Sequence, residues 1–168
     1  MDHAWTCHCC GKQFNSLPLD FGYDVPDYVL GIPGRERKRR AKLDSDFCVI
    51  DKTDFFVRGC IEIPILERDD CFAYGVWVSA SKVSFERIQK LWGASVITDE
   101  PSKFGWLSNN IRGYPSTLNL KTRLHLRGDR RRPYIELEPT DHPLAVEQRQ
   151  GISLGRVEQI VTRLLQGH

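Results

Sequence analysis

The chain has 168 residues, of which 40% are hydrophobic and 27% are charged, and its formal net charge is +2. This length and composition fit one soluble globular domain with a sizeable core. The charge is lower than the strong basic excess expected of a dedicated nucleic-acid-binding protein. No apolar stretch approaches the roughly 20 residues needed to cross a bilayer, and the first ten residues contain no secretory pattern. We therefore expect a cytoplasmic protein without a membrane span.

Residues 1–20 contain the spacing Cys-x-x-Cys-Gly, formed by Cys7, Cys10 and Gly11. Without a secretory signal, six cysteines are more typical of reduced thiols or metal ligands than of disulfides. Two thiolates at this spacing chelate one zinc ion from a tight turn. An unliganded N-terminal segment and a redox dithiol are the alternatives. Tetrahedral zinc needs two more ligands from elsewhere in the chain, and the available residues are Cys48, Cys60, Cys71, His125, His142 and His168.

A basic run occupies residues 35–40, from Arg35 to Arg40, and only Glu36 interrupts it. Such a run, together with residues 130–132, is a candidate for attracting phosphate groups of a nucleic acid. A solvated helix face or loop is the commoner meaning of a charged run, and we expect that here.

Residues 46–65 predict a β-hairpin around which the rest of the chain is organised. Residues 47–50 form a short apolar strand, residues 51–54 supply turn chemistry, and residues 55–65 alternate as in a strand with one face in a core. Residues 72–79 are apolar at nearly every position and predict a central strand. A helix then follows, with Ser84 as its cap and Gly93 at its end.

Residues 94–117 predict an irregular loop that folds back over the sheet, with Trp106 buried as its anchor. An exposed Trp106 would instead indicate a partner surface.

Residues 118–127 and 134–138 predict a second hairpin. Matching Leu124 with Leu137 sets His125 opposite Glu136, and it sets Arg123 opposite Glu138. Opposite charges across two strands stabilise a sheet by a few tenths to about 1 kcal/mol per pair. The glutamates also cancel much of the positive charge on the basic face of residues 118–127.

The segment Asp141-His142-Pro143 leads into a short helix that ends near Gly151. A residue before proline avoids the α region, so we expect His142 at the N-cap. There it is a candidate ligand or general base, with Asp141 orienting it; the alternative is a cap with no further role. Ser153 then begins an amphipathic helix.

Together these elements predict an α+β fold: a mainly antiparallel sheet of about five strands, two or three helices packed on it, and an N-terminal Cys-x-x-Cys-Gly knuckle. The domain spans residues 1–168, with a knuckle-like segment at 1–20 and the α+β core at 44–168.

Seven motifs occur in order along the chain: CxxCG, DFCVID, FFVRGCIEIPI, GVWVS, FGWL, YPSTLNLK and RPYIELEPTDHPLAVEQRQGI. This series resembles a bacterial family catalogued as a domain of unknown function, number twenty-one ninety-nine. The resemblance covers almost the whole chain and implies a single domain, but no activity. The family's N-terminal pattern is similar to Cys-x-x-Cys-Gly-x-x-His, and here Phe14 replaces the histidine, which removes the natural third metal ligand. Arg58 and His142 fall on motif positions.

Three functional hypotheses follow. The first is a non-catalytic protein that binds another protein in a regulatory or immunity-like role, because the sequence lacks the common catalytic fingerprints. The second is a small hydrolase or transferase that uses His142 with Asp141, Arg58 to hold an anion, and a thiol such as Cys60. It requires these side chains to converge on one pocket. The third is nucleic-acid binding through residues 35–40, with steep salt dependence.

Overall fold

The structure is a computed structural model that describes residues 4–7, 11 and 13–166. Its helices and strands, in chain order, are β1 (Trp5–Thr6), β2 (Gln13–Phe14), β3 (Asp20–Gly22), α1 (Asp27–Leu30), α2 (Gly34–Arg40), β4 (Ala41–Leu43), β5 (Phe47–Ile50), β6 (Asp54–Pro64), β7 (Cys71–Ala80), α3 (Lys82–Leu91), β8 (Lys103–Leu107), β9 (Lys121–His125), β10 (Tyr134–Leu137), α4 (Pro143–Gln150) and α5 (Leu154–Gln166). None of the helices in this part of the chain is long and apolar enough to span a membrane.

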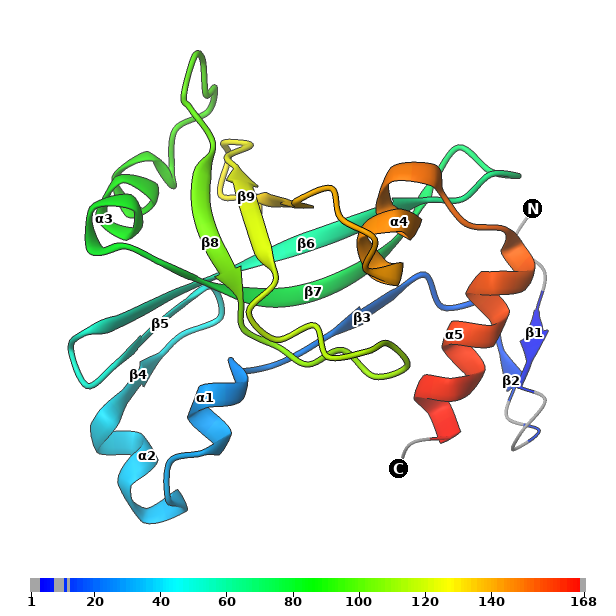
Figure 1. The fold of residues 1–168 in the computed structure, drawn as a ribbon, viewed down its shortest axis with the longest axis horizontal. Coiled ribbons are helices and arrows are strands. Elements are labelled where there is room, and N and C mark those ends of the chain that lie inside the picture. Colours follow the sequence, from blue (N-terminus) through cyan, green and yellow to red (C-terminus); the bar gives the residue numbers. More distant parts are fainter. Residues whose placement is uncertain (1–3, 8–10, 12, 167–168) are drawn as a thin grey trace.

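Five strands, β6 to β10, close into a barrel at the centre of the fold (Figure 1). Each strand from β6 to β10 runs antiparallel to the one before it, so the strand direction alternates along the series. Because the number of strands is odd, the first and the last strand run in the same direction. β10 therefore pairs in parallel with β6, where Tyr134 lies opposite Cys60 and the Cys60 N–H donates to the Pro133 carbonyl at 2.9 Å. Strands β3, β4 and β5 extend the sheet outside the barrel.

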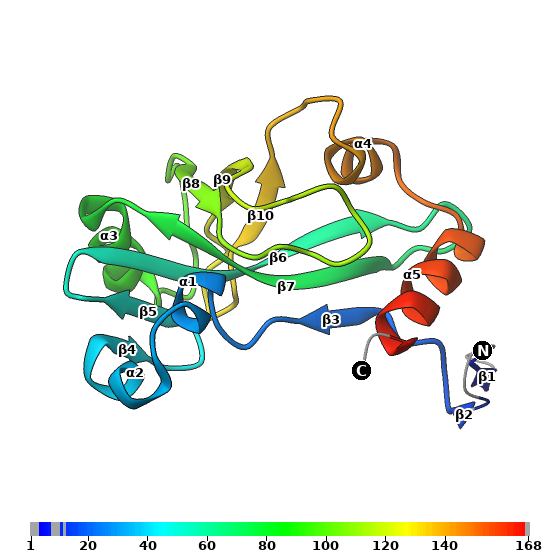
Figure 2. The same cartoon turned by 60° about the horizontal axis from the view of Figure 1, so that its bottom comes forward.

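The predicted α+β class is confirmed, but the sheet differs from the prediction. The strands that were expected to form a sheet of about five instead close on themselves, and the sheet they belong to has eight strands. The described residues also contain five helices rather than two or three. Figure 2 shows α4 and α5 at one end of the barrel and α2 with β4 at the other.

The predicted hairpin at residues 46–65 is present as β5 and β6, with Ile50 opposite Asp54. Asp51 and Lys52 adopt left-handed conformations, with φ of 50° and 62°. Such a conformation at two successive residues gives a tight turn whose twist matches that of antiparallel strands. The sequence pattern thus identified both the strands and the turn.

Two apolar cores use opposite faces of β6 and β7. The barrel interior holds the residues that alternate along the strands, and α4 and α5 add Leu144, Val157 and Val161 to it. A second cluster lies on the outer face, where the region of α1 covers Trp77 and Phe56, both buried. Burial on both faces explains why residues 72–79 are apolar at nearly every position.

The predicted register of the second hairpin is wrong by two residues, because Leu124 lies opposite Ile135 and Arg123 lies opposite Glu136. A shift by two keeps every side chain on its face, so alternation alone does not determine it. The connecting loop decides the register. This loop, between β9 and β10, extends away from the two strands and contacts the residues after α3, where the Asp129 N–H donates to the Ala94 carbonyl at 2.6 Å.

Helix α3 begins earlier than predicted. Ser81, not Ser84, is the N-cap, and its side chain accepts a hydrogen bond from the Ser84 N–H at 3.1 Å. A serine hydroxyl satisfies the backbone donor three residues further on, so either serine fits the pattern of a cap.

Candidate functional site

Trp106 is not buried: 42% of it is exposed, beside Phe104 at 38%. The expectation of a buried anchor is therefore wrong, and the irregular loop expected there contains β8. Along β8, Gly105 and Leu107 face inward and are buried, so Phe104 and Trp106 point outward. Their rings pack edge to face with centroids 5.0 Å apart. The short alternation Phe-Gly-Trp-Leu was the signal for this strand.

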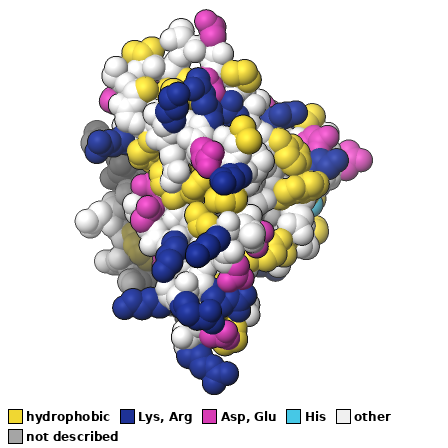
Figure 3. Space-filling model, turned by 90° about the vertical axis from the view of Figure 1, so that its left-hand side faces the viewer, with side chains coloured by type: hydrophobic (Ala, Val, Ile, Leu, Met, Phe, Trp, Pro, Cys, Tyr) yellow, Lys and Arg dark blue, Asp and Glu magenta, His cyan; other side chains and the backbone are white. Residues whose placement is uncertain are grey.

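These two aromatic residues form one wall of a groove of about 950 Å³. Other lining residues come from α1 with the residues that follow it, from the start of β6 and from the end of β7. Figure 3 shows this end of the molecule, where hydrophobic side chains lie among basic and acidic ones. The apolar lining consists of Tyr28, Ile32, Ile50, Phe55, Phe56, Ala80, Phe104, Trp106 and Leu118.

Tyr28 is held in place across the groove. Its hydroxyl donates a hydrogen bond to the Asn119 side-chain oxygen at 2.7 Å, and its ring packs on Phe56 with centroids 5.8 Å apart. The preceding residue, Asp27, accepts a hydrogen bond from the Asn110 N–H at 2.7 Å. The short helix α1 is thus tied to the loop after β8, which fixes this side of the groove.

The charges around the groove are mixed. Arg40 donates two hydrogen bonds to the Asp51 carboxylate, at 2.8 and 2.7 Å, and this bonding lowers the pKa of Asp51. On β9, Lys121 lies opposite Trp106 and Arg123 lies opposite Phe104. The Arg123 guanidinium is 5.9 Å from the Phe104 ring centroid. A pair of cations therefore borders the two exposed aromatic rings.

Most arginines of the basic run bond within the protein. In α2, Arg37 donates to the Ile32 carbonyl at 2.9 Å, Arg39 to Glu36 at 3.1 Å, and Arg40 to Asp51. A run whose guanidiniums already have partners offers fewer contacts to phosphates. This arrangement fits the expected charged helix better than a nucleic-acid surface.

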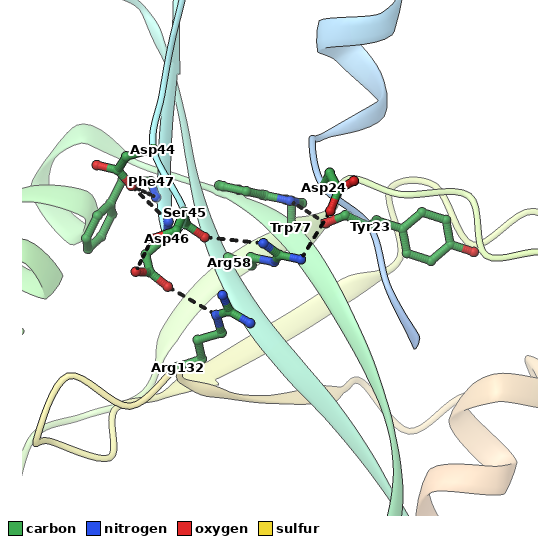
Figure 4. A network of polar contacts seen from close by, with 9 residues as sticks. All are labelled: Tyr23, Asp24, Asp44, Ser45, Asp46, Phe47, Arg58, Trp77 and Arg132. Atoms are coloured by element: carbon green, nitrogen blue, oxygen red, sulfur yellow. Dashed lines mark hydrogen bonds and ion pairs between the residues drawn. The ribbon is translucent and has the colours of Figure 1, made fainter. Parts of the chain in front are cut away.

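The predicted site residue Arg58 lies on the outer face of β6, opposite Trp77. Its guanidinium is 5.8 Å from the Trp77 ring centroid. It approaches the exposed Asp24 carboxylate at 3.9 Å and the Ser45 carbonyl at 3.4 Å (Figure 4). Burial, and then the positive charge of Arg132, lower the pKa of Arg58.

His142 is the N-cap of α4, as predicted. Its Nδ1 accepts a hydrogen bond from the Leu144 N–H at 3.1 Å. Its Nε2 lies 3.1 Å from the Pro115 carbonyl and 3.2 Å from the Ser116 carbonyl. Carbonyls only accept, so Nε2 carries the proton and the ring is the neutral tautomer. Nδ1 thus caps α4, and Nε2 ties the start of this helix to the loop between β8 and β9. Asp141 is exposed.

Arg58 and Cys60, two of the predicted candidates, share a face of β6. Within the described part of the chain, the residues that contact Arg58 differ from those that hydrogen-bond His142. Convergence of the candidates on one pocket therefore stays a prediction. Burial raises the pKa of Cys60 and that of Cys48 to about 11. A nucleophilic cysteine needs the opposite shift, because the thiolate is the reactive form.

The predicted zinc knuckle is only partly within the described residues. Cys7 is buried in the main core, and the Gly11 N–H donates to its carbonyl at 2.9 Å, whereas Cys10 lies outside the described residues. Among those described, no group of three or more His, Cys, Asp or Glu side chains is arranged to hold a metal ion. A zinc site at Cys7 and Cys10 therefore stays a prediction.

Comparison with known proteins confirms the family resemblance. Residues 6–152 match the model of a family described as "Uncharacterized protein conserved in bacteria (DUF2199)". No curated protein and no solved structure matches the chain.

Proposed function

Because the chain belongs to this bacterial family, whose description names no activity, we propose its function from its own geometry: it is a non-catalytic domain that binds another protein through the aromatic groove. The pair Phe104 and Trp106 carries this proposal. Rigid aromatic side chains dominate the energy of protein interfaces, and here they stand exposed beside a pocket. Tyr28, itself 41% exposed, lines the same groove.

The charges indicate the kind of partner. Lys121 and Arg123 border the aromatic rings on β9, and neither makes an ion pair among the described residues. A partner segment with a large apolar side chain would pack on the aromatic rings, and an acidic residue beside it would pair with Lys121 or Arg123. Complementary charge of this kind steers encounter and fixes register. The partner we propose is therefore an apolar and acidic segment of another protein.

Two other functions have less support. A hydrolase or transferase needs a free general base or an activated thiol, whereas His142 uses both ring nitrogens within the fold and burial raises the thiol pKa values. Nucleic-acid binding needs a continuous positive surface, whereas Arg37, Arg39 and Arg40 of the basic run bond within the protein.

Selection of peptides from a random library on the immobilised full chain tests the proposal. We expect selected peptides to combine an aromatic or large aliphatic residue with an acidic one. Trp106→Ala should weaken their binding about thirtyfold, the effect of a hot spot worth roughly 2 kcal/mol, as measured by calorimetry. Lys121→Glu should slow association.

Val96→Ala is the matched control, because Val96 is 73% exposed and lies outside the groove. It should leave binding unchanged. Peptides that bind wild type and Trp106→Ala equally would contradict the proposal. Salt-sensitive binding of a single-stranded oligonucleotide that is lost in Trp106→Ala would favour a nucleic acid instead.

A further inference from the structure

Arg58 has far weaker partners than Arg40 and Arg87 have. Arg40 and Arg87 each donate two hydrogen bonds of 2.7–3.0 Å to a carboxylate. Arg58 has contacts of 3.4 and 3.9 Å, and its Nε is buried with no hydrogen-bond partner in the described part of the chain. A buried donor without a partner costs free energy. The capacity of this guanidinium to bind a ligand lies in Nη1 and Nη2, whose contacts are long.

A second guanidinium, that of Arg132, lies beside Arg58 (Figure 4). Arg132 comes from the loop before β10, and its Nε donates to Asp46 at 3.1 Å. The closeness of the two positive charges is one cause of the lowered pKa of Arg58. Like charges that the fold holds together favour an anion between them.

The nearby carboxylates, Asp46 and Asp24, neutralise the two guanidiniums only in part. Asp46 is engaged by Arg132 and also accepts a hydrogen bond from the Ser45 hydroxyl at 2.9 Å. Asp24 has a fully exposed side chain and reaches Arg58 only at 3.9 Å. An incoming anion therefore competes with the solvated Asp24 carboxylate at Arg58 and with the Asp46 carboxylate at Arg132.

The position of Arg58 is fixed before binding. Its guanidinium lies over the buried Trp77 ring on one side. It also lies near Gly22, where a Cβ would come within 3.1 Å of Nη2. A guanidinium that the fold already holds in place loses little entropy when it binds a ligand.

We propose that Arg58 and Arg132 form a binding site for a phosphate group. A phosphate presents oxygens in three dimensions and accepts hydrogen bonds from two guanidinium forks at once. A carboxylate has two oxygens in one plane and suits a single fork. The phosphate is either a free ion or a phosphorylated side chain.

Calorimetric titration of the full chain at low salt tests this site. The probes are inorganic phosphate, N-acetyl-O-phosphoserine amide and acetate. We expect saturable binding of at least one phosphate probe and much weaker binding of acetate. Binding of inorganic phosphate identifies a free ion as ligand, and binding of phosphoserine alone identifies a modified protein. Absence of phosphate binding, or equal binding of acetate, would overturn the proposal.

Two variants act in opposite directions. Arg132→Gln should weaken phosphate binding at least about tenfold, because one fork is lost. Asp24→Asn should tighten it about fivefold, because a competing charge near 4 Å is removed. Arg149→Gln, which removes an arginine on α4, should change nothing. Phosphate binding that is the same in Arg132→Gln, Asp24→Asn and wild type would also overturn the proposal, even if wild type binds.

Discussion

The side-chain oxygen of Asn109 accepts a hydrogen bond from the backbone N–H of Trp77 at 2.7 Å. The amide of the same side chain donates to the Val25 carbonyl at 2.9 Å and to Asp27 at 3.1 Å. Asn109 is fully buried. One side chain thus joins the barrel strand β7 to the segment that carries Tyr28, a residue of the proposed binding groove.

Asn109→Ala should destabilise the protein by about 3 kcal/mol, because it leaves buried backbone groups of Trp77 and Val25 without partners. Urea denaturation measures this loss. Gln159→Ala, at an exposed position of α5, is the control and should stay within about 0.5 kcal/mol of wild type. A loss below about 1 kcal/mol in Asn109→Ala would mean that solvent replaces these hydrogen bonds.

Gly59 lies where the barrel closes between β6 and β10. A Cβ at this position would come within 2.5 Å of Ile135 Cδ1 and 2.9 Å of the Pro133 carbonyl. We expect Gly59→Ala to cost roughly 2 kcal/mol of stability, because the packed core has to shift. Gly34→Ala is the control: a Cβ there meets nothing within 4 Å, and alanine favours the helix by up to about 1 kcal/mol. Equal stability of the two variants would contradict a tightly packed closure.

The strands that alternate over many residues could be predicted from the sequence. The hairpin of β5 and β6 and the strand β7 follow directly from their patterns. Closure of the barrel could not be predicted, because the pairing of Tyr134 with Cys60 joins distant segments and leaves no local signal. Likewise, β8 alternates over only a few residues between glycines and prolines, so Trp106 was assigned to a loop.

In the candidate site, too, the features that depend on local sequence could be predicted, and those that depend on contacts between distant segments could not. The N-cap role of His142 follows from the proline after it, which is a local property. The groove, in contrast, is assembled from at least five separated parts of the chain. The pairing of Arg58 with Arg132 likewise depends on how the loop before β10 folds, and the sequence alone contains no measure of that.

Cys7 is buried in the main core, so Cys7→Ser should destabilise the protein by about 1–2 kcal/mol whether or not metal binds, because a hydroxyl is costly to bury. Thermal denaturation with and without a chelator separates the two causes. A chelator that also destabilises wild type would confirm the predicted zinc. Unchanged stability of Cys7→Ser would contradict the core position.

Glu100 accepts hydrogen bonds from Arg87, both at 3.0 Å, and lies 2.8 Å from Lys103. The bonds from Arg87, and then that from Lys103, lower the pKa of its carboxyl from 4.5 to about 2. Because the folded pKa is the lower one, the ionised carboxylate stabilises the fold above about pH 4.5, and this contribution is lost as the pH falls towards 2. The difference in melting temperature between wild type and Glu100→Gln should therefore shrink over that range. Glu86→Gln, whose carboxylate lies 3.9 Å from Lys82, is the control. A difference that stays constant from neutral pH to pH 2 would show that the charge of Glu100 does not stabilise the fold.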